Sequence, residues 1–116
     1  MIALGRRVQV WAYPAPADLR KGYNGLYGLV KNGLGRDPLS GDVFLFLNRR
    51  RTSMKALLWD GTGLCIFMKR LERHQFASLW RDEGDVLELT TSELSLFIEG
   101  CVVVGRVPLS PPRVIV

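Results

Sequence analysis

Basic side chains are the residues of this sequence whose types and spacing most clearly predict a chemistry. Three consecutive arginines stand at positions 49–51, and further cations follow at Lys55, Lys69, Arg70 and Arg73. A cluster of cations binds a polyanion, either the phosphates of a nucleic acid or an acidic protein surface. Lysine and arginine are also common at exposed hairpin ends, where they block pairing between sheet edges. We favour a polyanion-binding surface, because close like charges repel by about 1 kcal/mol per pair even through water.

The net charge of the chain conceals an uneven distribution. Sixteen Lys and Arg and eleven Asp and Glu give a formal net charge of +5 over 116 residues. The part up to Arg81 carries a net charge of +9, and the part from Asp82 onward carries −4. With 47% hydrophobic residues, the composition is that of an ordinary globular domain and excludes a wholly disordered chain. The charge therefore predicts an anionic partner and says nothing about the fold.

Few residues are available for catalysis. Four carboxylates could bind the metal ions of a nuclease: Asp18, Asp37, Asp42 and Asp60. All but Asp42 suit a turn or a helix cap. The single histidine, His74, has no identifiable partner for acid–base chemistry, and the sequence contains neither a phosphate-binding loop nor a zinc-ligand spacing. We therefore predict no catalytic residue, no metal site and no cofactor.

The sequence shows no sign of export or membrane insertion. The first residues lack the apolar run of a signal peptide, and no segment reaches the roughly 18 apolar residues that a membrane span needs. Cys65 and Cys101 lie in apolar runs without a metal-binding spacing, which suits a reducing compartment. We expect a cytoplasmic protein with no membrane partner.

The elements that position the basic residues follow from hydrophobic spacing. Residues 8–13 are rich in β-branched and aromatic side chains, which predicts a strand. An apolar residue recurs every three or four positions from Leu19 to Leu34, which predicts a helix over about 18–34 with Asp18 as its N-cap. Three further strands are predicted at 43–47, 55–59 and 64–69.

The turn at residues 60–63 sets the register of the two strands beside it. Its Asp-Gly pair provides the positive-φ residue that a tight hairpin needs. Pairing outward from this turn places Met54 opposite Lys69 and Ser53 opposite Arg70. The cations of this hairpin then lie at the same end of the sheet as the triple arginine, and the start of the predicted helix flanks them. Nine residues are predicted to contact nucleic acid: Arg20, Lys21, Arg49, Arg50, Arg51, Lys55, Lys69, Arg70 and Arg73.

The remaining sequence completes the predicted fold. Residues 86–89 suit a strand, and Thr90 and Glu93 form a capping box that begins a short helix. Residues 101–104 suit another strand. We predict an α+β fold with an antiparallel β-meander of about four to six strands, one longer N-terminal helix and one short C-terminal helix. We predict that residues 1–105 form the single domain and that residues 106–116 form an extended, proline-containing tail.

Several long motifs in this chain resemble those of a known family. They lie at 18–26, 37–41, 49–51, 58–65 and 69–73. Over residues 5–100, their order and spacing are similar to those of the TnpB-type accessory protein. This protein is the product of the second open reading frame in bacterial insertion sequences of the sixty-six family. The resemblance implies a small protein that is needed for transposition alongside a separate transposase, which carries the catalytic acidic residues.

These observations lead to one leading hypothesis and two alternatives. We predict a non-catalytic accessory factor for insertion-sequence transposition that binds DNA through the basic end of its sheet. The first alternative is an adaptor that docks on the transposase, with the same arginines pairing with acidic side chains. The lesser alternative is a metal-dependent nuclease.

Overall fold

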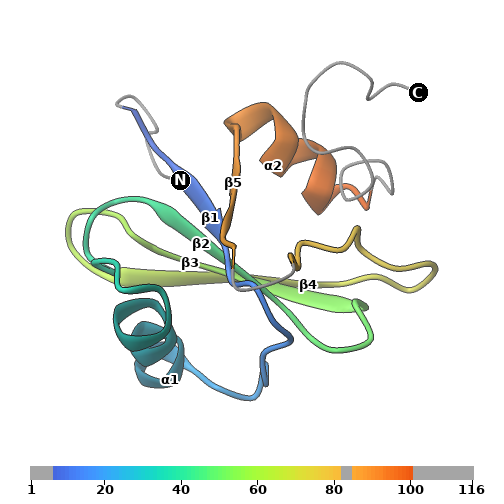
Figure 1. The fold of residues 1–116 in the computed structure, drawn as a ribbon, viewed down its shortest axis with the longest axis horizontal. Coiled ribbons are helices and arrows are strands. Elements are labelled where there is room, and N and C mark those ends of the chain that lie inside the picture. The colour runs from blue at the N-terminus through green and yellow to red at the C-terminus, as the bar shows by residue number, and fades with distance from the viewer. Residues whose placement is uncertain (1–6, 82–84, 101–116) are drawn as a thin grey trace.

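Five strands form one sheet in the part of the chain that the computed structural model describes, residues 7–81 and 85–100 (Figure 1). The strands are β1 (Val10–Ala12), β2 (Val43–Leu47), β3 (Ser53–Trp59), β4 (Leu64–Arg70) and β5 (Leu87–Leu89), in the spatial order β4-β3-β2-β1-β5. Helix α1 (Tyr23–Gly28), continued by η1 (Leu29–Leu34), covers one face, and α2 (Thr91–Ile98) covers the other. The predicted α+β class is confirmed.

Strands β2, β3 and β4 form the predicted antiparallel meander. Met54 pairs with Lys69 and Ser53 pairs with Arg70, as the position of the hairpin turn predicts. In that turn the Asp60 carboxylate accepts hydrogen bonds from the N–H groups of Thr62 at 2.9 Å and of Gly63 at 3.0 Å. These bonds hold the turn in place and, with it, the register of the whole hairpin.

The sheet as a whole is mixed, so the prediction of a purely antiparallel sheet is wrong. Strand β1 runs parallel to β2, with Trp11 opposite Phe44. Parallel neighbours need a long crossover connection, and residues 13–42, which contain the first helix, provide one. Strand β5 pairs antiparallel with the other side of β1, with Trp11 opposite Glu88.

The first helix begins later than predicted. Its N-cap is Gly22, and the predicted N-cap, Asp18, accepts a hydrogen bond from the Arg20 N–H at 3.0 Å instead. Because this hydrogen bond engages the Asp18 carboxylate in a local turn, Asp18 does not cap the helix, which starts five residues later at Tyr23. The second half of the helix is wound as a π-helix and ends at Gly35, whose φ of +66° is one that glycine adopts without strain.

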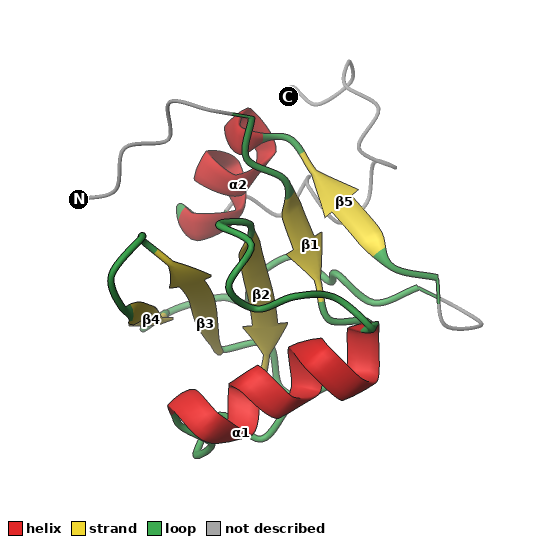
Figure 2. Ribbon diagram, turned by 90° about the vertical axis from the view of Figure 1, so that its left-hand side faces the viewer, coloured by secondary structure: helices red, strands yellow, loops and turns green. Residues whose placement is uncertain are grey.

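Two apolar cores pack on the two faces of the sheet, one beneath each helix. Figure 2 shows α1 and α2 on opposite sides of the sheet. All five residues of β2 are buried, which confirms that its uninterrupted apolar sequence marks a central strand. Phe44 and Phe46 point into the core beneath the first helix, where Leu26 and Val30 are fully buried. Alternate residues of β2 point into the other core, which contains Phe97 of α2.

The predicted capping box of the second helix is confirmed. The Thr90 hydroxyl accepts a hydrogen bond from the Glu93 N–H at 3.0 Å, and the Glu93 carboxylate accepts one from the Thr90 N–H at 2.8 Å. Among the described residues, no helix is long and apolar enough to cross a membrane. The predicted strand at 101–104 and the predicted tail at 106–116 lie outside the described residues.

Candidate nucleic-acid interface

The turn between β2 and β3 is shaped by Asn48. Its side-chain oxygen accepts a hydrogen bond from the Thr52 N–H at 2.9 Å, and its amide nitrogen donates to the Thr52 hydroxyl at 3.0 Å. The Asn48 carbonyl accepts a further bond from the N–H of Arg51, which adopts a φ of +60°. These bonds close the turn and leave Arg49 and Arg50 exposed at its tip.

Arg51 joins this turn to the loop that follows β4. The Phe76 N–H donates to the Arg51 carbonyl at 2.7 Å, and Arg51 Nη1 donates to the Phe76 carbonyl at 2.8 Å. Gln75 Nε2 donates to the Arg50 carbonyl, also at 2.8 Å. Phe76 is fully buried and stacks on Phe97, with 5.1 Å between the ring centroids. The turn and the loop are therefore held side by side on a buried anchor.

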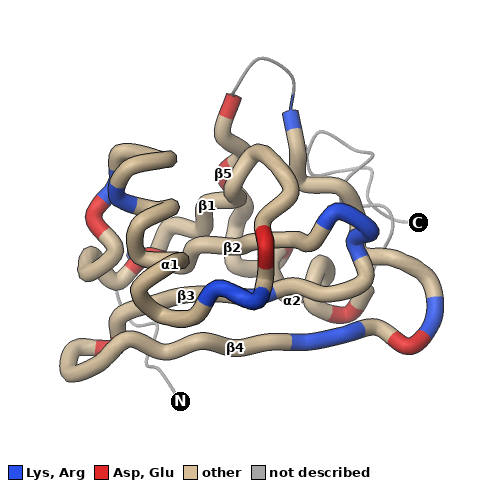
Figure 3. Tube along the Cα trace, turned by 90° about the horizontal axis from the view of Figure 1, so that it is seen from below, with Lys and Arg blue, Asp and Glu red and all other residues tan. Residues whose placement is uncertain are grey.

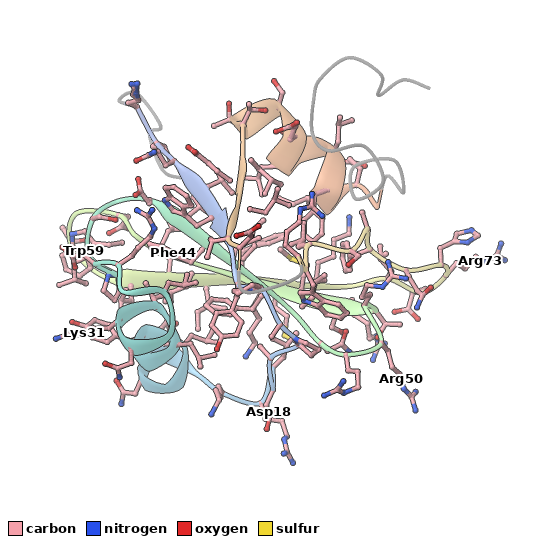
Figure 4. All side chains as sticks on the ribbon, in the orientation of Figure 1. Asp18, Lys31, Phe44, Arg50, Trp59 and Arg73 are labelled. Atoms are coloured by element: carbon pink, nitrogen blue, oxygen red, sulfur yellow. The ribbon has the colours of Figure 1, made fainter. Side chains whose placement is uncertain are left out.

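The guanidinium groups of Arg49, Arg50 and Arg73 have no partner among the described residues. Their side chains are exposed and form no hydrogen bond or ion pair with any described residue. Figure 4 shows Arg50 and Arg73 at the same end of the molecule, whereas Lys31 and Trp59 lie at the opposite end. Among the described residues, no carboxylate therefore neutralises the charge of Arg49, Arg50 or Arg73.

The segment before the first helix brings Arg20 and Lys21 to the sheet. Lys55 of β3 donates from Nζ to the Lys21 carbonyl at 2.9 Å. The Arg20 guanidinium binds the Asp18 carboxylate with two nitrogens, Nη2 at 2.8 Å from Oδ2 and Nε at 3.0 Å from Oδ1. These hydrogen bonds hold the pKa of Asp18 well below its usual range and raise the pKa of Arg20. Arg20 is therefore neutralised locally, while the Lys21 ammonium is exposed.

Lys69 and Arg70 are neighbours in β4 and therefore point to opposite faces of the sheet. Lys69 Nζ donates to the carbonyl of Ile98, the last residue of α2, at 2.8 Å. A cation at this position is favoured by the helix dipole. Arg70 Nε donates to the Glu72 carboxylate at 3.0 Å, and both side chains are exposed. The two cations thus have different surroundings despite their adjacency.

The nine predicted contact residues divide into two groups. Arg51, Lys55 and Lys69 are half-buried and donate to backbone carbonyls, so they hold segments of the fold together. The other six are exposed: Arg20, Lys21, Arg49, Arg50, Arg70 and Arg73. In Figure 3 the blue Lys and Arg positions at the end of β4 and in the loop after it lie toward one end of the sheet.

Two residues outside the predicted set, Asn48 and Gln75, also shape this surface. Both side chains are uncharged, so a prediction based on positive charge does not include them. Asn48 directly precedes the triple arginine, and an asparagine at such a position is typical of a side-chain-stabilised turn. No local signal marks Gln75, because its partner, the Arg50 carbonyl, lies 25 residues earlier.

The four carboxylates considered for metal binding have partners within the fold. Asp42, which has no evident role in the sequence, accepts hydrogen bonds from the Gln9 N–H at 3.1 Å and from Trp11 Nε1 at 3.4 Å. The Asp37 carboxylate accepts the Leu39 N–H at 2.9 Å, and the other two serve the turns described above. Within residues 7–81 and 85–100, no group of three or more His, Cys, Asp or Glu side chains could hold a metal ion.

Comparison with known proteins supports the resemblance seen in the motifs. Residues 8–106 match the family model described as IS66 Orf2 like protein. The uncharacterized proteins y4jC and y4hO of Sinorhizobium fredii are each 34% identical to the chain, over 100 and 101 residues. These alignments cover 86% of this chain and 85% and 86% of the two relatives. No solved structure matches the chain.

Proposed function

The chain belongs to the IS66 Orf2-like family of transposition-associated accessory proteins, and from this premise we propose that it binds DNA through its exposed arginines. The contacts that we assign to phosphate are those of Arg49, Arg50 and Arg73. We name this set the arginine cluster. The family is not one known for catalysis, and we propose a role in DNA binding without a reaction of its own.

The observation that carries this proposal is the uncompensated charge of the arginine cluster. Three exposed guanidinium groups occupy two adjacent segments, and none is paired with a carboxylate among the described residues. The hydrogen bonds between Arg51 and Phe76 keep these segments together, so the charges do not disperse. Fixed like charges are costly unless a polyanion neutralises them, and DNA phosphates do so while releasing counterions.

Three further exposed cations, Arg20, Lys21 and Arg70, lie outside the arginine cluster and add weaker contacts to DNA. Arg20 and Arg70 are exposed but paired with Asp18 and Glu72, so each must exchange a carboxylate for a phosphate to contact DNA. Lys21 is exposed and is held close to β3 by the bond from Lys55 to its carbonyl. Contacts to phosphate position a protein along DNA without reading its sequence. We therefore propose binding that depends on charge more than on base sequence.

A DNA-binding assay with a salt titration tests this proposal against the adaptor alternative. The protein is freed of bound nucleic acid by nuclease, repurified, and incubated with labelled element ends or random duplexes at increasing salt. A protein that binds DNA through phosphate contacts binds both duplexes at low salt, and its affinity for both falls steeply as the salt concentration rises. An adaptor captures purified transposase after nuclease treatment and shows no affinity for either duplex. That second result would contradict the proposal.

A nuclease role is tested separately. The purified protein is incubated with labelled element ends in the presence of magnesium or manganese ions. We expect the DNA to remain intact, because the carboxylates that could bind metal are occupied in turns and by indole and backbone N–H groups. Cleavage that is lost on adding a chelator would overturn the proposal of a non-catalytic role.

A further inference from the structure

Strand β4 is a long edge strand with apolar side chains on its surface. In the sheet that the described residues form, β4 spans seven residues and lies at the end of the strand order, whereas β5, at the other edge, spans three. Phe67 is 47% exposed and Met68 is 53% exposed, and as neighbours they point to opposite faces. An exposed, apolar edge of this length is a template for pairing with another strand.

The hydrogen bonds of the β3–β4 hairpin show which backbone groups face outward. The Asp60 N–H donates to the Gly63 carbonyl, and the Leu71 N–H donates to the Thr52 carbonyl. Bonded pairs alternate along an antiparallel ladder, so the odd-numbered residues of β4 bond to β3. The N–H and C=O groups of the even-numbered residues therefore point away from the sheet. These residues are Leu64, Ile66, Met68 and Arg70.

We propose that a second copy of this chain docks on this edge, with the two β4 strands antiparallel and Phe67 opposite Phe67. In this register the outward-facing residues of one copy meet those of the other, Leu64 with Arg70 and Ile66 with Met68. Each such pair exchanges two main-chain hydrogen bonds. No other antiparallel register pairs all four outward residues, because this one is centred on the strand.

Burial of the exposed side chains favours this same register. The two Phe67 residues form a non-hydrogen-bonded pair, in which side chains approach most closely, and paired aromatic rings stabilise a sheet. On the opposite face, Met68 of each copy lies beside Ile66 of the other. Both exposed apolar side chains of β4 therefore leave water when the strands pair.

The charges on β4 favour an antiparallel over a parallel arrangement. The C-terminal end of the strand carries Lys69 and Arg70, and the other end adjoins the turn that contains Asp60. A parallel pair would place the cations of the two copies side by side, where like charges repel. The antiparallel pair separates them by the length of the strand and brings the basic end of each copy toward the acidic turn of the other. A self-complementary edge of this kind is typical of a two-fold symmetric dimer.

The mass of the nuclease-treated protein in solution tests the proposal independently of DNA binding. We expect twice the chain mass of 13.1 kDa by light scattering or sedimentation equilibrium. Phe67→Lys places two like charges directly opposite each other and should give a monomer. Leu39→Lys is the matched control, because Leu39 is 41% exposed in the turn before β2, and this variant should remain dimeric. Circular dichroism and thermal unfolding verify that both variants are folded.

Cross-linking tests the register. Cysteine is introduced by Phe67→Cys in a chain that carries Cys65→Ser and Cys101→Ser, and the protein is then oxidised. Opposed Cα atoms in a non-hydrogen-bonded pair are about 4.5 Å apart, which a disulfide spans, so a covalent dimer should form. Met68→Cys in the same background should not cross-link, because residue 68 lies opposite residue 66. A monomeric protein, a dimer that persists in Phe67→Lys, or cross-linking at 68 in place of 67 would overturn the proposal.

Discussion

Arg51 and Phe76 hydrogen-bond to each other in both directions, the Phe76 N–H to the Arg51 carbonyl and the Arg51 guanidinium to the Phe76 carbonyl. One residue belongs to the β2–β3 turn and the other follows β4, 25 residues later. Because Phe76 is fully buried, this contact fixes an exposed turn to the hydrophobic core. Arg51, the last residue of the charged run 49–51, therefore holds the other two arginines in place.

Removal of the Arg51 side chain should destabilise the fold more than removal of an ordinary surface arginine. Arg51→Ala loses a charged hydrogen bond to a half-buried carbonyl, at a cost of about 2 kcal/mol in the free energy of unfolding. Arg51→Gly loses the same bond but relieves a φ of +60°, which costs a non-glycine residue about 1 kcal/mol. In urea unfolding, the glycine variant should therefore be the more stable of the two. Equal stabilities would show that the backbone at this position is not strained.

Substitution of Lys69 and Arg70 should separate stability from DNA affinity. Lys69→Met removes the cation from the C-terminus of α2 and should lower the free energy of unfolding by about 1 kcal/mol. Arg70→Met removes one exposed ion pair and should change it by less than about 0.5 kcal/mol. DNA affinity should fall in the Arg70 variant and stay near wild type in the Lys69 variant. The reverse pattern would place the DNA-binding surface on the α2 face of the sheet.

The pair of Asp18 and Arg20 should give a measurable pH signature. The hydrogen bonds from Arg20 lower the pKa of Asp18 in the folded chain below the value of about 3.9 that an unfolded chain has. The pair therefore contributes stability above the unfolded pKa and loses it as the pH falls through the folded pKa. Carboxyl carbon chemical shifts should titrate at a lower pH for Asp18 than for an unperturbed aspartate. In Arg20→Ala this midpoint should return toward 3.9, and an unchanged midpoint would refute the assigned cause.

The hairpin is the part of the fold that local sequence determines most completely. A two-residue turn fixes register, so the Asp-Gly pair at 60–61 suffices to place Met54 opposite Lys69. The capping box at Thr90 is likewise a short-range pattern. The direction of β1 depends instead on where the chain returns after the first helix. The local sequence therefore predicts that β1 is a strand but does not predict that it pairs in parallel with β2.

The sequence predicts where the basic residues gather. It does not predict which of them bond within the fold and which remain exposed. The cations lie next to the β2–β3 turn or at the end of β4, and the strand register places these segments at the same end of the sheet. The structural use of Lys55 and Lys69 depends on carbonyl groups 34 and 29 residues away. The opposite directions of Lys69 and Arg70 do follow from strand alternation alone. A charge count treats all of these side chains as equivalent.

Salt-dependent DNA binding by paired charge-removal variants tests the central claim most directly. Arg50→Ala with Arg73→Ala removes two exposed cations from the basic end. Arg7→Ala with Lys31→Ala removes two exposed cations that lie outside the arginine cluster. The account predicts that the first variant loses about tenfold or more in affinity and that the slope of log affinity against log salt becomes shallower by about 2. The control variant should keep the wild-type slope. Equal losses in both variants, or unchanged affinity in the first, would contradict the assignment of this surface to DNA.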